Sequence, residues 1–173
     1  EWNKREKKQE EYFWLAAAEW ADQHGACIIS SSLGYGNKLY KVKDMDGHHS
    51  VVSFAATVAA QKGILVVNSA GNEYDSRWKT IITPSDADSV MCVGGINPYT
   101  DRHIYFSSRG PSSDFRIKPN ITAPAHVVAA NPNGGFSQTW GTSFSCPLVS
   151  GFAACAWQSD STLSNMQLFK RIE

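Results

Sequence analysis

The sequence predicts an α/β fold in which a doubly wound parallel sheet is covered by helices on both faces. Two observations lead to this prediction. Short, continuously apolar segments at 26–32, 64–68 and 90–96 alternate with longer segments whose apolar residues recur at helical spacing. Strands that are apolar on both sides are typical of parallel sheets, because helices pack against each face of such a sheet.

In the first half of the chain, each expected element follows from its apolar pattern. Residues 4–23 are charged at first and apolar later, and their apolar side chains share one face of a helix. A strand is expected at 26–32, and a polar loop that contains several glycines follows it. A helix at 49–62 then precedes the strand at 64–68.

The second half of the chain is expected to hold three strands and two helices. The strands cover 90–96, 126–130 and 136–140, one helix begins near Ser143, and the last helix covers 162–171. A stretch rich in Ser, Gly and Pro, which ends at Pro124, is expected to connect the first of these strands to the second. The sequence Asn-Pro-Asn-Gly-Gly at 131–135 has the composition of a hairpin turn between the last two strands.

Composition and charge set limits on the class of protein. The chain has 173 residues, of which 42% are hydrophobic, and its formal net charge is zero. This length suits one domain, and the neutral balance gives no reason to expect nucleic acid or an anionic membrane as a partner. No apolar run approaches the ~20 residues that a membrane-spanning helix needs.

The four cysteines show no disulfide pattern. Cys27 and Cys92 fall in predicted strands, whereas Cys146 and Cys155 share one predicted helix and lie about 13 Å apart along its axis. We therefore expect all four thiols to be reduced and mostly buried as small apolar side chains. No Cys-x-x-Cys or paired-His spacing predicts a metal ion, and no cofactor is expected.

The most informative motif is the segment 141–147, Gly-Thr-Ser-Phe-Ser-Cys-Pro, which lies directly ahead of an apolar segment rich in Ala and Gly. Proline is tolerated in the first turn of a helix, so Pro147 indicates a helix start near Ser143. Free backbone N–H groups at a helix start favour negative charge, which suits an activated serine or a developing oxyanion. Taken alone, the motif also fits a serine that caps a helix.

An asparagine follows the strand expected at 64–68, within the sequence Ser-Ala-Gly-Asn-Glu at 69–73. Taken alone, this segment also fits an ordinary turn at the end of a strand. Further motifs occur in order at 32–34, 84–90, 106–111 and 118–124. The ordered set resembles the subtilisin-like serine proteases (subtilases), and it extends over most of residues 25–157.

The resemblance implies a partial subtilisin-like peptidase domain, and hence an incomplete version of the predicted sheet. Its parts would be a leading helix (1–24), a core that carries the motifs (25–157) and a C-terminal helix (158–173). By the same resemblance, Ser143 would attack the scissile carbonyl of a polypeptide substrate. The side-chain amide of Asn72 and the backbone N–H of Ser143 would hold the oxyanion that forms.

The resemblance also implies a substrate cleft. Ser32, Leu33 and Gly34 would pair with the substrate backbone and line one wall of the first specificity pocket, and Ala70 and Gly71 would line the other wall. Small residues suit these walls because the substrate backbone passes close by. Family resemblance further implies an extracellular, periplasmic or cell-envelope location, and structural calcium is compatible with it.

The aspartate and histidine of the family's catalytic triad would both precede the Ser-Leu-Gly strand, and residues 1–24 contain neither motif. The chain is therefore expected to be the C-terminal portion of a catalytic domain and inactive alone. His48 and His49 are an alternative base, but they follow that strand, which favours a polar helix start with Asp46 at its N-terminus. A pseudo-protease or peptide-binding module is the alternative function. An unrelated hydrolase is disfavoured, since no Gly-x-Ser-x-Gly motif occurs.

Overall fold

A computed structural model describes residues 7–173 of the chain. Its main sheet has five strands, four of them parallel. The parallel strands are β1 (Ile28–Ser31), β2 (Leu65–Ser69), β3 (Val90–Asn97) and β5 (Ile121–Pro124), and β4 (Arg102–His103) pairs antiparallel with β3. The order is β1-β2-β3, with β5 also paired to β3, so β1 is an edge strand.

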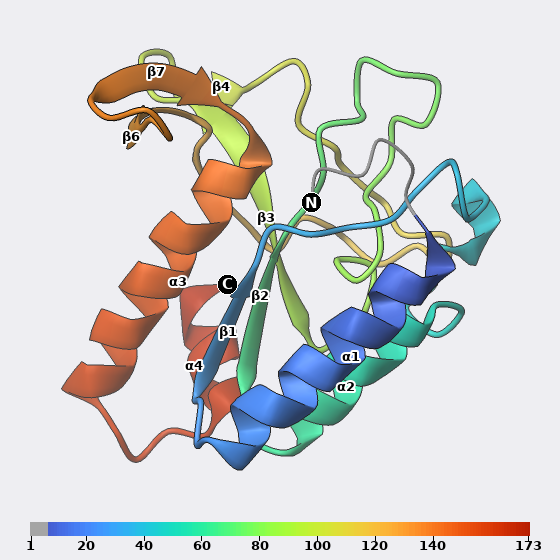
Figure 1. The fold of residues 1–173 in the computed structure, drawn as a ribbon, viewed down its shortest axis with the longest axis vertical. Coiled ribbons are helices and arrows are strands. Elements are labelled where there is room, and N and C mark those ends of the chain that lie inside the picture. The colour runs from blue at the N-terminus through green and yellow to red at the C-terminus, as the bar shows by residue number, and fades with distance from the viewer. Residues whose placement is uncertain (1–6) are drawn as a thin grey trace.

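Helices cover both faces of the sheet, as the sequence predicts (Figure 1). One layer consists of α1 (Lys8–Gln23) and α2 (Val51–Gln61), and the other of α3 (Thr142–Ser159) and α4 (Asn165–Ile172). A short 3₁₀ helix, η1 (Val42–Asp44), precedes α2. The hairpin of β6 (His126–Ala130) and β7 (Phe136–Trp140) lies beside the start of α3, at the top of Figure 1.

Alternating side chains of the central strands form two separate cores. Val66 and Val90 point into the layer of α1 and α2, where they pack with Val52 of α2 and Trp14 of α1. Their neighbours Leu65, Val67, Met91 and Val93 point to the opposite face and pack against α3 and α4. This alternation follows from the period of two along a strand, and it explains why both strands are apolar throughout.

Most of the expected elements are present, with shifts of a few residues at their ends. The helix expected at 4–23 is found as α1, and residues 4–6 lie outside the described part of the chain. Three short elements were not predicted, namely η1, β4 and β5. The strand β5 has only four residues and ends in Pro124, so its sequence resembles the Pro-rich loop in which it lies. The division at residues 24 and 157 stays a prediction.

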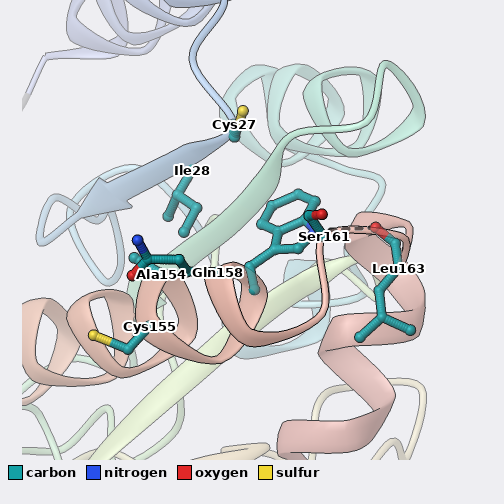
Figure 2. A pocket seen from close by; sticks show the side chains of 8 residues that line it. Cys27, Ile28, Ala154, Cys155, Gln158, Ser161 and Leu163 are labelled. Atoms are coloured by element: carbon teal, nitrogen blue, oxygen red, sulfur yellow. Dashed lines mark hydrogen bonds between the residues drawn. The ribbon is translucent and has the colours of Figure 1, made fainter.

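The expectation that the thiols are mostly buried is wrong for two of the four cysteines. All four are free, and Cys92 and Cys146 are buried, but Cys27 and Cys155 are exposed. These two line a cavity of about 630 Å³ beside the edge strand, together with Ile28, Trp157 and Leu163 (Figure 2). Cys27 precedes the edge strand and Cys155 lies on the outward face of α3, so neither has a neighbouring element to cover it.

Membrane-spanning helices and metal clusters are both absent from the described residues. Within 7–173 no helix combines the length and the apolar character that crossing a membrane requires. The same residues contain no cluster of three or more His, Cys, Asp or Glu side chains that could hold a metal ion.

Candidate active site

Three segments that are distant in sequence meet where the carboxyl ends of the parallel strands face the start of α3. The first follows β1 and carries Ser32, the second follows β2 and carries Asn72, and the third is the first turn of α3 with Ser143. In Figure 1 this region lies at the upper ends of β1 and β2. Open parallel sheets place their sites at this edge, because the loops that leave the strands converge there.

Asn72 is held directly against the first residue of α3. Its side-chain oxygen accepts hydrogen bonds from the backbone N–H of Thr142 at 2.9 Å and from the Thr142 hydroxyl at 3.0 Å. Because the oxygen is occupied by two donors, the orientation of the amide is fixed, and its Nδ2 group remains free to donate to another acceptor. The residue is exposed, so that acceptor can come from solvent or a ligand.

The backbone conformation of the turn before α3 requires a glycine, whereas the contact with Asn72 does not. Gly141 has a φ of 144° and a ψ of 149°, a conformation that side-chain-bearing residues rarely adopt. A Cβ atom at this position would lie 3.7 Å from Asn72 Nδ2. The backbone N–H of Gly141 donates to the carbonyl of Ala125 at 2.9 Å, which ties the turn to the end of β5.

Ser143 is the second residue of α3 and is half-buried. Its backbone N–H belongs to the first turn, where amides have no partner within the helix. This N–H and the Nδ2 group of Asn72 are the two donors that the sequence predicts for an oxyanion, and both lie at the start of α3. The geometry therefore supports the predicted pairing of these residues.

Ser32 reaches the same turn from the end of β1. Its hydroxyl donates to the backbone carbonyl of Ser143 at 2.9 Å. That carbonyl would normally accept from the N–H four residues later, but residue 147 is a proline and has no N–H. Pro147 is the sixth residue of the helix, so the expectation that it lies in the first turn is wrong. The missing helical bond is replaced by Ser32.

The two predicted walls of the cleft are close to each other. Gly34 follows Ser32 and Leu33, and Leu33 is exposed. On the other side, Ala70 is fully buried and Gly71 has a φ of 104°, so the backbone turns sharply there. Gly71 is joined to the connection between β4 and β5 through the Ser108 N–H, which donates to the Gly71 carbonyl.

The histidines of the described residues contact other groups, and His126 of β6 pairs with Trp140 just ahead of α3. No hydrogen bond joins a histidine to the Ser143 hydroxyl within residues 7–173. The backbone N–H groups of His48 and His49 donate to the Asp46 carboxylate, just ahead of the N-cap of α2. Since α2 and α3 cover opposite faces of the sheet, the favoured interpretation of these two histidines as part of a polar helix start agrees with their position.

The described residues also contain a buried lysine that sequence analysis missed. Lys118 donates from Nζ to the carbonyls of Ala87 and Val90 and to the Asn120 side chain, at 2.8 to 2.9 Å. Burial lowers the pKa of this ammonium below its usual value. The group holds the loop before β3 and is no part of the candidate site. A lysine next to a proline gave no signal of burial in the sequence.

Comparison with known proteins decides the family. The model of the subtilase family matches residues 5–172. The chain belongs to this family. Subtilisin DY from Bacillus licheniformis is 31% identical over 159 residues, which are 91% of this chain and 52% of the relative. Pyrolysin from Pyrococcus furiosus is 32% identical over 164 residues, which cover 78% of this chain and 11% of that protein.

Solved structures agree with this assignment. Sphericase superimposes with a TM-score of 0.72 at 31% identity, over 95% of this chain and 53% of its own. A cold-adapted subtilisin-like serine proteinase has the same fold with a TM-score of 0.69 at 24% identity. The chain thus has the subtilisin-like fold of a family of serine proteases, and it spans about half the length of Subtilisin DY and of Sphericase.

Proposed function

We propose that this chain supplies the serine and the oxyanion donors of a subtilisin-like endopeptidase. The observation that carries the proposal is the contact between Asn72 and Thr142, which places an amide donor beside the N–H of Ser143. In the proposed reaction, the Ser143 hydroxyl attacks the scissile carbonyl and forms an acyl-enzyme. The two donors would then stabilise the negative oxygen of the tetrahedral intermediate, because donors held in place before the reaction need no reorganisation as charge develops.

The proton of Ser143 needs an acceptor, and no hydrogen bond joins the Ser143 hydroxyl to a base within residues 7–173. A serine hydroxyl is a poor nucleophile without a general base, so the proposed reaction requires a histidine from another segment or chain. The edge of β1 is the place where such a segment would bind, since β1 pairs with β2 alone among the described strands.

The proposed partner is a polypeptide in extended form, bound along Ser32–Gly34 as an additional strand. We also propose an extracellular, periplasmic or cell-envelope location, on the strength of the family alone. The competing function is peptide binding without catalysis. It is favoured by one observation, the lack of a base beside Ser143 in the described residues.

The test is to express the protein together with any coding sequence that precedes Glu1. An endopeptidase should cleave a fluorogenic peptide, and Ser143→Ala should abolish this turnover. Loss of the equivalent asparagine donor in subtilisin itself lowers kcat by about 10²–10³, and Asn72→Ala should show a fall of this order. Peptide binding without turnover in the longest natural form would instead establish the non-catalytic alternative.

A further inference from the structure

One isoleucine fills the space between the two predicted walls of the cleft. Ile82 lies in the long loop between β2 and β3, and its backbone N–H donates to the carbonyl of Ala70 at 3.2 Å. The next residue, Thr83, forms an antiparallel bridge with Tyr35, with hydrogen bonds of 2.9 and 3.1 Å in both directions. Ile82 is therefore fixed to both segments at once.

Three glycines surround this side chain. A Cβ atom at Gly34 would lie 2.7 Å from Cγ1 of Ile82, and a Cβ at Gly71 would lie 3.0 Å from the same atom. A Cβ at Gly36 would lie 3.0 Å from its Cγ2. All three distances are shorter than an ordinary contact between carbon atoms, so the walls have room for the isoleucine only because they lack side chains.

We propose that Ile82 determines substrate specificity by shortening the first specificity pocket, so that the pocket admits only small side chains such as those of glycine and alanine. The proposal rests on the proposed function, because it assumes that Ser32–Gly34 and Ala70–Gly71 are the walls of that pocket. The side chain is half-buried, and the rest of its surface is open to solvent. It is apolar and branched at Cβ, which restricts its χ1 rotamers, and its backbone is held by the bridge beside it.

The size of the expected preference follows from packing. One methylene more or less in an apolar pocket changes recognition by about 10- to 200-fold. A phenylalanine side chain exceeds alanine by much more than one methylene, and close-packed protein interiors do not yield to such a difference without strain. We expect a preference for alanine over phenylalanine of at least about tenfold.

The proposal can be tested by binding, which needs no turnover. Fluorescein-labelled tetrapeptides Ala-Ala-Ala-X, with a free carboxylate and X as Ala or Phe, are titrated with the protein, and Kd is measured by anisotropy. The wild type should bind the Ala peptide at least about tenfold more tightly than the Phe peptide. Ile82→Ala should remove or reverse this preference. Ile117→Ala, which truncates an isoleucine that is 88% exposed, should leave it unchanged.

Several outcomes would overturn the proposal. Equal affinity of the wild type for both peptides, or an unchanged preference in Ile82→Ala, contradicts the role of Ile82. Absence of binding by the wild type and by Ile82→Ala contradicts the pocket and the proposed function together. If the Ala preference is present but Asn72→Ala leaves both Kd values unchanged, the oxyanion role of Asn72 fails and the pocket stands.

A second measurement checks the packing without any ligand. Gly34→Ala should lower the urea midpoint of the wild type markedly, since its new Cβ would collide with Ile82. In the Ile82→Ala background, the same substitution should cost less, because the Ile82 atoms are gone and only the Thr83 carbonyl, at 3.1 Å, stays close to the new Cβ. Equal effects in the two backgrounds would show that Ile82 does not occupy the space between the walls.

Discussion

The described residues surround Ser143 more fully on the side of β2 than on the side of β1. On the side of β2, the Asn72 amide, the Thr142 backbone and the Gly141 turn are all held by hydrogen bonds. On the side of β1, the edge strand has no outer partner among the described residues, and Cys27 just before it is exposed. Oxyanion donors can be positioned by one half of a site, whereas proton transfer needs the other half as well.

The largest consequence of this difference is expected in catalytic activity. Residues 1–173 alone should show no measurable peptide turnover, because the remaining donors and binding groups accelerate such reactions by only about 10³–10⁴ over water. The measurement combines a fluorogenic peptide assay with labelling by a fluorophosphonate probe. Strong labelling and turnover that both disappear in Ser143→Ala would show that a base lies within this chain, and His48 and His49 would be the first candidates.

A second test addresses the turn at Gly141, on the β2 side of Ser143. Gly141→Ala should destabilise the protein by about 1–3 kcal/mol, since the backbone at this position lies in a region that only glycine adopts without strain. Urea unfolding measures the change. Gly151→Ala is a suitable control, because a Cβ at Gly151 meets no atom within 4 Å and its position is helical. It should be neutral or slightly stabilising.

The link between the two sides is the hydrogen bond from Ser32 to the Ser143 carbonyl. Ser32→Ala should reduce the free energy of unfolding by about 1 kcal/mol, because one hydrogen bond is lost and Pro147 offers no replacement donor. Ser159→Ala, which removes an exposed hydroxyl bonded to a helix carbonyl, serves as the matched control. An effect of Ser32→Ala no larger than that of the control would show that the link contributes nothing.

The smallest expected effect concerns the exposed face of α3. An unpaired edge strand and exposed apolar side chains favour association between copies of a chain. Phe152→Glu should therefore reduce the self-association constant several-fold, on the order of what burial of one aromatic side chain contributes. Sedimentation velocity over a range of concentrations measures it. An unchanged constant would show that this face of α3 is not the surface through which copies associate.

Contacts between segments with clear strand or helix patterns could be predicted from the sequence, whereas contacts that depend on the path of a loop could not. The meeting of Asn72 and Ser143 follows from their sequence contexts, because one ends a buried strand and the other starts a helix at the same sheet edge. The exposure of Cys155 could not be predicted, since its segment is apolar and its pattern does not show which residues face away from the sheet. The placement of Ile82 against Gly34 also depends on a loop whose path no local pattern determines.

Pro147 has a further consequence for the motions of this region. A helix usually opens and closes with its own hydrogen bonds, but the carbonyl of Ser143 is held by a hydroxyl from another element. We therefore expect the first turn of α3 to share part of its fluctuations with the segment that follows β1. Segments of this kind exchange their amide hydrogens together. A peptide that orders the segment at Ser32 would slow amide exchange at Ser143 and leave the later turns of α3 unaffected.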